Sequence, residues 1–125
     1  MKKIFLVIGI MLLLCACKDS KNLNSSLENQ SSFITGEKMQ ELMKENDYII
    51  LDVRTEDEYN NSHVKGAINI PHNLIDENIA LDKTKIIFVY CLSGRRSSLA
   101  HNTLEALGYT VYNLGAFENI DLPKD

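Results

Sequence analysis

The stretch that most constrains how this chain folds joins a short apolar segment, a tight loop and an amphipathic segment between residues 85 and 108. The first segment, Lys85–Tyr90, is rich in β-branched residues and shows no alternation, which is typical of a strand buried on both faces. The third segment carries apolar or small residues at helical spacing, at Ala100, Thr103, Leu104 and Leu107. Gly108 stands where helices commonly end in a left-handed glycine. The stretch therefore predicts a buried strand, a short loop and a helix over 97–107.

Strand and helix signals also alternate in the rest of the chain. Further strands are expected at residues 48–53, 67–70 and 110–114. Thr35 fits the N-cap of a helix whose apolar face carries Met39, Leu42 and Met43. Thr55 and Glu58 form the pattern of a capping box at the start of a short helix. A helical turn is expected over 73–80, with the inward side chains Leu74, Ile75 and Ile79. This alternation predicts an α/β fold, with a small parallel sheet flanked by helices on both faces.

The loop between the central strand and helix, Cys91 to Arg96, carries a cysteine at its first position. A tight turn that leads into a helix presents backbone N–H groups as a concave anion site, and the helix N-terminus adds positive potential. Arg95 and Arg96 add positive charge, and Gly94 allows the backbone to turn back toward the sulfur. Such surroundings lower the pKa of a thiol. We therefore expect Cys91 to be a thiolate near neutral pH, beside a cup that holds an anionic sulfur or an oxyanion.

The motif Cys-x-x-Gly-x-Arg-Ser, formed by Cys91, Gly94, Arg96 and Ser97, resembles the active-site loop of the rhodanese (sulfurtransferase) family. A second segment resembles the same family, with Leu51-Asp52-Val53-Arg54, Glu58-Tyr59, His63 and Gly66-Ala67-Ile68-Asn69-Ile70-Pro71 in order. The resemblance covers residues 34 to 114. Two motifs in the correct order are much more specific than either one alone.

The resemblance implies a rhodanese-like fold and a sulfurtransferase in which Cys91 is the nucleophile. Cys91 would take sulfane sulfur from thiosulfate or a similar small anionic donor as a persulfide, and pass it to a thiol or cyanide. The sulfur donor would lie against the loop residues Leu92, Ser93, Gly94, Arg95 and Arg96. The residues expected to brace the loop are Asp52, Arg54 and Ser97. No cofactor is implied, and the chain offers too few convergent ligands for a metal site.

Two other classes of function share a reactive cysteine. Rhodanese-like phosphatases and arsenate reductases carry a loop one residue longer than Cys91–Arg96. The Cys-x5-Arg pattern of tyrosine phosphatases would need an arginine at the position of Ser97. A phosphatase is therefore disfavoured. A binding module that carries a persulfide to a partner without turnover needs the same residues, so that alternative stays open.

Residues 1–16 are predicted to be a lipoprotein signal peptide. Lys2 and Lys3 precede an apolar run that ends at Ala16, which is shorter than the roughly 20 residues that a spanning helix needs. The ending Leu14-Cys15-Ala16-Cys17 resembles the lipobox of bacterial lipoproteins. By that resemblance Cys17 becomes the first residue of the mature protein and carries acyl chains such as palmitate. The protein would then be exported and membrane-anchored, facing the periplasm or the cell exterior; the alternative is an ordinary secretory signal.

Processing at Cys17 would leave a tether over 17–32 and one rhodanese-like domain over 33–125. The tether is rich in Asn, Ser, Lys and Glu without hydrophobic periodicity, which predicts disorder. Loss of Lys2 and Lys3 reduces the 13 basic residues to 11, against 17 acidic ones, for a net charge of −6. Nucleic acid is an improbable partner, because its binding needs a basic face. We expect a monomer whose only free thiol is Cys91.

Replacing Cys17 with alanine tests the anchor. We expect Cys17→Ala to lose metabolic labelling with a palmitate analogue and to be released or mislocalised, because acyl chains rather than charge would hold the protein at the membrane. Cys15→Ala is the matched control and should keep the label. Unchanged labelling of Cys17→Ala would contradict the lipoprotein assignment.

Overall fold

The computed structural model describes residues 33–125, and the predicted signal peptide, the predicted lipidation site Cys17 and the predicted tether lie outside that range. The elements follow in the order α2 (Gly36–Glu45), β1 (Tyr48–Asp52), α3 (Glu56–Asn61), β2 (Ile68–Asn69), η2 (His72–Leu74), β3 (Ile86–Cys91), α4 (Arg95–Ala106), β4 (Val111–Ala116) and η3 (Phe117–Asn119). Within this part of the chain no helix is long and apolar enough to cross a lipid bilayer.

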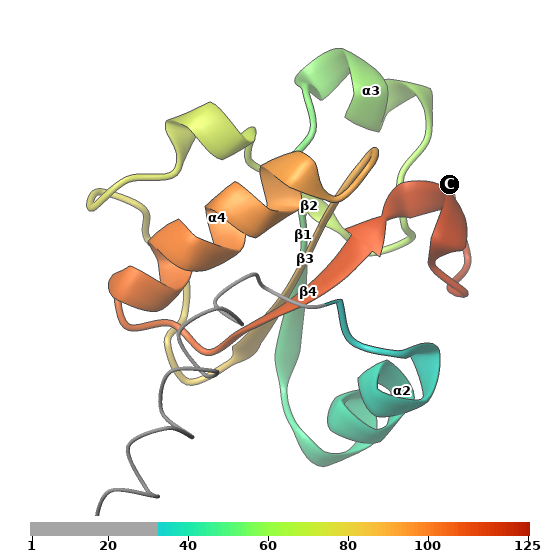
Figure 1. Cartoon of the computed structure of the whole chain (residues 1–125), viewed down its shortest axis with the longest axis horizontal. Coiled ribbons are helices and arrows are strands. Elements are labelled where there is room, and N and C mark those ends of the chain that lie inside the picture. The colour runs from blue at the N-terminus through green and yellow to red at the C-terminus, as the bar shows by residue number, and fades with distance from the viewer. Residues whose placement is uncertain (1–32) are drawn as a thin grey trace, which may run out of the picture. The chain divides into compact units, whose positions relative to one another are not determined.

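The four strands form one sheet in the order β2-β1-β3-β4, and every neighbouring pair is parallel (Figure 1). Ile50 of β1 lies beside Phe88 of β3. All six residues of β3 are buried, as expected for the central strand of a sheet that is covered on both faces. Because the strands are parallel, their C-terminal ends meet at one edge, where Asp52 ends β1 and Cys91 ends β3.

Alternate side chains of β3 enter two separate hydrophobic clusters, since successive residues of a strand point to opposite faces. The cluster on one face joins the sheet to α2 and includes Met39, Leu42, Phe88 and Tyr90. The cluster on the other face joins the sheet to α4 and includes Ile87, Val89, Cys91, Ala100 and Leu104. The predicted α/β architecture, with helices on both faces of a parallel sheet, is therefore confirmed (Figure 1).

The helix ends follow the signals read from the sequence. Thr35 caps α2, and its hydroxyl accepts the Lys38 N–H at 3.1 Å. Thr55 and Glu58 form the predicted capping box at the start of α3. Gly108 follows α4 with a φ of 95°, a left-handed conformation that glycine adopts without strain.

Two element boundaries differ from the predictions. The helix α4 starts at Arg95 rather than Ser97, because the left-handed Gly94 turns the chain directly from the loop into the first helical residue. The strand β4 continues past Leu114 to Ala116, where it pairs with Cys91 after a register shift between Val89 and Tyr90 of β3. The loop is therefore shorter, and the sheet edge beside it longer, than the sequence pattern indicated.

The helix expected over 73–80 does not form; the 3₁₀ turn η2 stands at its start. Ile75 and Ile79 point inward as expected and pack in the cluster on the α4 face, but Leu74, also expected to point inward, is 61% exposed. The His72 N–H instead donates to the Val53 carbonyl at 3.0 Å, which ties this segment to the end of β1. The Asp76 side chain accepts the N–H of residue 78 at 2.9 Å, a local bond that competes with helix formation.

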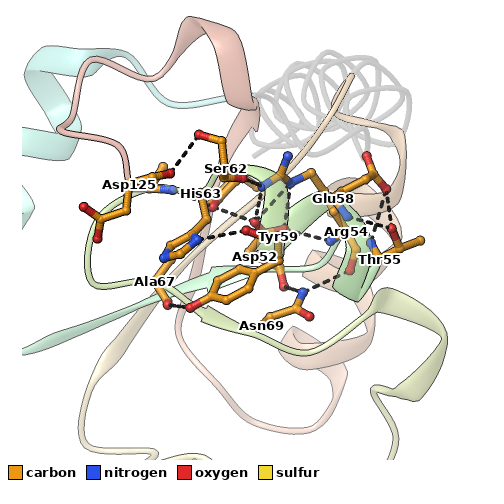
Figure 2. Close-up of polar contacts among 12 residues, drawn as sticks. Asp52, Arg54, Thr55, Glu58, Tyr59, Ser62, His63, Ala67, Asn69 and Asp125 are labelled. Atoms are coloured by element: carbon orange, nitrogen blue, oxygen red, sulfur yellow. Dashed lines mark hydrogen bonds and ion pairs between the residues drawn. The ribbon is translucent and has the colours of Figure 1, made fainter.

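A buried ion pair ties the end of β1 to the segments that follow (Figure 2). Arg54 Nη2 lies 2.6 Å from Asp52 Oδ2, and Arg54 Nε lies 3.0 Å from both carboxylate oxygens. The same Nη2 also donates to the Ser62 carbonyl at 2.6 Å. Burial works against the charge of Arg54, but the hydrogen bonds and charge of Asp52 outweigh it, so the pKa of Arg54 is raised. Two buried charges are tolerable in this position because each is paired and hydrogen-bonded.

The Tyr90 hydroxyl extends this network to the central strand. It donates to Asp52 Oδ2 at 2.7 Å and accepts the Val64 N–H at 3.0 Å. The Arg54 guanidinium carbon lies 4.3 Å from the centre of the Phe117 ring, a cation–π contact. Burial and the hydrogen bond to Asp52 raise the pKa of Tyr90 above its usual range. The network thus joins β1, β3 and the segments around Val64 and Phe117.

Removing the Tyr90 hydroxyl measures how much this network stabilises the domain. We expect Tyr90→Phe to lower the free energy of unfolding by about 2 kcal/mol, because Asp52 and the Val64 N–H each lose a buried partner. Urea denaturation at neutral pH measures the change. Tyr112→Phe, whose half-buried ring packs beside Phe88, is the matched control and should stay within about 0.5 kcal/mol of the wild type. Equal losses in the two variants would show that the hydroxyl bonds contribute nothing specific.

Candidate active site

The candidate site lies at the C-terminal edge of the sheet, where parallel α/β sheets place their functional groups. Cys91 ends β3, the connecting loop has only the residues Leu92–Gly94, and α4 begins at Arg95. Gly94 is the N-cap of α4 and has a φ of 99°, in the left-handed region. This turn brings the positive N-terminus of α4 back to the end of β3, beside the cysteine.

The Cys91 sulfur is surrounded by hydrogen-bonding groups of its own loop. The Gly94 N–H donates to Sγ at 2.9 Å, and Ser97 Oγ lies 3.5 Å from Sγ. Burial disfavours the charged sulfur and raises its pKa. The hydrogen bond between Cys91 and the Ser97 side chain, together with those from the backbone N–H groups of Ser97, Gly94 and Ser93, outweighs burial, so the pKa of Cys91 is lowered. These hydrogen bonds therefore increase the fraction of Cys91 that is thiolate at a given pH.

The Gly94 carbonyl group is held by hydrogen bonds from the first turn of α4. It accepts the Ser97 hydroxyl at 3.0 Å, the Ser98 hydroxyl at 2.8 Å and the Ser98 N–H at 3.1 Å. Asn113 Nδ2 of β4 in turn donates to the Ser98 hydroxyl oxygen at 3.1 Å. The Gly94 N–H that binds the sulfur is thus held in place by the first turn of α4 and, through Asn113, by the neighbouring strand.

Arg96 does not stand free beside the thiol but forms a bidentate ion pair with Glu58 of α3. The two nitrogen–oxygen distances are 2.6 and 3.0 Å. The hydrogen bond from Arg96 is the main cause that lowers the pKa of Glu58 to about 2, so the pair stays ionised well below neutral pH. Glu58 also binds Thr55 in the capping box. Arg96 therefore ties the start of α4 to α3, and its charge is largely compensated.

The remaining loop residues predicted to bind the sulfur donor face solvent. Leu92, Ser93 and Arg95 are exposed, and within residues 33–125 no ion pair involves Arg95. Asp52 and Arg54 lie at the end of the neighbouring strand, and their side chains bind each other. Asp52 also accepts the Tyr90 hydroxyl, and Arg54 also donates to the Ser62 carbonyl. The site therefore combines one acidic thiol, several N–H groups and one exposed cation.

Three features of the site escaped the sequence analysis. The first is the ion pair between Glu58 and Arg96, which are 38 residues apart in the chain. The second is the Tyr90 hydroxyl on Asp52, also over 38 residues. The third is Phe33, whose ring lies against Gly94. A prediction that β1 and β3 pair in parallel would have brought the first two pairs together. Asp52 and Tyr90 are register partners in that pairing, and the helices that follow the two strands start at the same edge of the sheet.

The comparison with known sequences agrees with this geometry. The model of the rhodanese-like domain family matches residues 35–121. The thiosulfate sulfurtransferase PspE of Escherichia coli K12 is 44% identical over 78 residues, which cover 59% of this chain and 75% of PspE. The thiosulfate sulfurtransferase GlpE of Coxiella burnetii is 37% identical over 81 residues, which cover 62% of this chain and 76% of GlpE.

Solved structures give the same result. A structure of a rhodanese with anions from E. coli is 40% identical, has a TM-score of 0.59, and covers 62% of this chain and 96% of its own. A protein from Lactobacillus plantarum is 27% identical, has a TM-score of 0.64, and covers 86% of this chain and 97% of its own. Together with the loop from Cys91 to Ser97 at the end of β3, these similarities show that the chain belongs to the rhodanese-like family.

Proposed function

We propose that this chain is a sulfurtransferase that carries sulfane sulfur on Cys91. The observation that carries the proposal is the Cys91 thiol at the end of β3, which accepts the Gly94 N–H at 2.9 Å in surroundings that lower its pKa. The thiolate is the nucleophilic form of cysteine, and a lowered pKa increases its fraction at a given pH, which favours attack on an electrophilic sulfur. The relatives PspE and GlpE are both named thiosulfate sulfurtransferases, which supports thiosulfate as the class of sulfur donor.

The proposed reaction has two half-reactions. The Cys91 thiolate attacks the outer sulfur of thiosulfate, the bond between the two sulfur atoms of thiosulfate breaks, and sulfite leaves with the electron pair. Cys91 is then a persulfide. Cyanide or a thiolate attacks the terminal sulfur, leaves as thiocyanate or as a new persulfide, and restores the Cys91 thiolate. The electrons balance without a cofactor, and the covalent intermediate predicts double-displacement kinetics.

The proposal gives the other loop residues separate roles. The N–H groups of residues 92–96 would hold the terminal sulfur of the persulfide, as the Gly94 N–H already holds Sγ. Arg95, exposed and without an ion pair among residues 33–125, would attract the anionic sulfur donor. Arg96 would position the loop through Glu58. Ser97 would support the loop through its contacts with Gly94 and Cys91, and Asp52 and Arg54 would support it through the network at the ends of β1 and β3.

A sulfur carrier without turnover is the second candidate. Cys91 has 0% exposed surface in the described structure, which favours slow or partner-dependent release of sulfur. A phosphatase or arsenate reductase is disfavoured, because the loop from Cys91 to Arg96 has the sulfurtransferase length. Steady turnover with cyanide separates an enzyme from a carrier, and hydrolysis of a phosphate ester would support the phosphatase class.

The proposal extends to location and partners. The lipobox-like ending at Cys17 supports a membrane-anchored protein exposed to the periplasm or the cell exterior. The acidic chain, with 13 basic against 17 acidic residues, supports a small anion and a thiol or cyanide as partners rather than nucleic acid. We propose that the protein acts as a monomer.

Intact mass spectrometry after incubation with thiosulfate tests the central claim. We expect the purified full chain to gain one sulfur atom, and peptide mapping to place that atom on Cys91. Cyanide should then remove it and release thiocyanate. The Cys91→Ser variant should show neither the added sulfur nor turnover, while it keeps cooperative unfolding, because the substitution is nearly isosteric. Turnover retained by Cys91→Ser would refute the assignment of the nucleophile.

The two loop arginines should contribute in different ways. We expect Arg95→Ala to raise KM for thiosulfate about fivefold and to reduce its salt dependence, with kcat nearly unchanged, because an exposed charge attracts the donor through screened solvent. Arg96→Ala should instead lower kcat and raise the pH midpoint of Cys91 alkylation. The reason is that it leaves the Glu58 carboxylate without its partner and loosens the start of α4. Steady-state kinetics at two ionic strengths and iodoacetamide reactivity against pH measure these effects.

Glu58→Gln serves as the matched control for Arg96. It removes the ion pair but keeps the arginine, so it should lower kcat as Arg96→Ala does, without the rise in KM expected for Arg95→Ala. If Arg95→Ala and Arg96→Ala shift the alkylation midpoint equally, the division of roles between them is wrong.

A further inference from the structure

The Cys91 sulfur cannot be reached in the described arrangement. Cys91 is 0% exposed, yet the proposed reaction requires a sulfur donor to touch Sγ. Either the short loop from Leu92 to Gly94 or a group that rests on it must move before the donor arrives. One side chain that lies against this loop, at Gly94, is Phe33.

The Phe33 ring lies on two glycines from different parts of the chain. A Cβ atom built on Gly94 would lie 2.3 Å from Phe33 Cζ, and one built on Gly115 would lie 2.8 Å from Phe33 Cδ2. Both distances are shorter than real Cβ contacts allow, so the ring occupies the space that a side chain at either position would need. The outer end of the ring therefore meets the catalytic loop, and its inner end meets β4.

The contact of this ring differs from an ordinary core contact. Phe33 is 50% exposed, so one half of its surface faces water. The next residue, Ile34, attaches the chain to β4 through an N–H bond to the Asn113 carbonyl at 3.0 Å. The backbone next to Phe33 is thus fixed, while the ring can move away from the two glycines by rotation about the side-chain torsions of Phe33. Gly94, on which the ring rests, is also the residue whose N–H binds the sulfur.

We propose that Phe33 is a positioning residue for the Cys91 loop: its ring rests on Gly94 and Gly115, keeps the Gly94 N–H on the sulfur, and swings away to admit the sulfur donor. The inference deepens the proposed function and rests on it. It implies that removing the ring has two opposite consequences for the thiol. The sulfur becomes easier to reach, and the hydrogen bond that favours its charged form becomes weaker.

Alkylation of Cys91 separates these two consequences. The full chain, purified in detergent, is treated with iodoacetamide over a range of pH, and peptide mass spectrometry follows Cys91 alone. The rate at high pH, where the thiol is fully ionised, reports access, and the pH midpoint reports the hydrogen bond. We expect Phe33→Ala to raise the high-pH rate by about threefold or more and to move the midpoint upward. Leu99→Ala, which truncates a side chain of similar exposure (53%) on α4, should change neither value.

A second variant tests whether the Phe33 ring must lie close against Gly94. Phe33→Tyr adds a hydroxyl at Cζ, the ring atom nearest to Gly94, and should push the ring off the glycine. We therefore expect Phe33→Tyr to shift the midpoint in the same direction as Phe33→Ala. A half-exposed aromatic residue with a merely structural role would accept tyrosine without any change.

The alkylation results test the role of Phe33 independently of sulfur transfer. Wild-type values for both the high-pH rate and the midpoint in Phe33→Ala would overturn the inference, even if the thermal stability of that variant falls. A wild-type chain that alkylates normally but gains no sulfur from thiosulfate would refute the sulfurtransferase proposal instead. Because alkylation needs no sulfur donor, the two failures cannot be mistaken for each other.

Discussion

The site depends on the backbone of one residue, Gly94. Its N–H binds the Cys91 sulfur, its carbonyl is held by the first turn of α4, and its Cα faces the Phe33 ring. Gly94 has a φ of 99°, and the ring occupies the space that a Cβ atom at this position would need. A side chain at this position would be strained by the backbone angle and would also collide with the ring. The turn from strand to helix, one of the hydrogen bonds that lower the pKa of the thiol, and the contact of the Phe33 ring with the loop therefore all involve Gly94.

Neutral groups, rather than free cations, contribute most to the lowered pKa of the thiol. Two arginines near the sheet edge are already bound to carboxylates, Arg54 to Asp52 and Arg96 to Glu58. Short hydrogen bonds inside a protein are little affected by salt, whereas attraction between exposed charges is screened over about 10 Å at moderate ionic strength. The acidity of Cys91 should therefore be insensitive to salt, and only steps that depend on the exposed Arg95 should respond to it.

Local sequence signals predicted most of the fold and part of the site. The caps at Thr35 and Thr55, the buried run of β3 and the glycine after α4 are each set by residues within a few positions of one another. The pairs that were missed, Glu58 with Arg96 and Asp52 with Tyr90, both span 38 residues and exist only because β1 and β3 are neighbours. The helix predicted after His72 does not form, because the His72 N–H bonds to the Val53 carbonyl of a distant segment and this contact overrides the local apolar spacing. Sequence patterns report local propensity, whereas these contacts follow from strand order.

The alternation of side chains along β3 explains how rigid bracing and reactive chemistry coexist at one strand end. Tyr90 and Cys91 are consecutive, so their side chains must point to opposite faces of the sheet. Tyr90 lies in the cluster on the α2 face and binds the buried carboxylate of Asp52, while Cys91 lies in the cluster on the α4 face. The charged network therefore fixes the end of β3 from one side without placing a carboxylate beside the sulfur. A shift of one residue in this strand would exchange the two faces and bring the thiol against Asp52, where a negative charge would raise its pKa. The register of β3 against β1 is thus as important to the thiol as the loop itself.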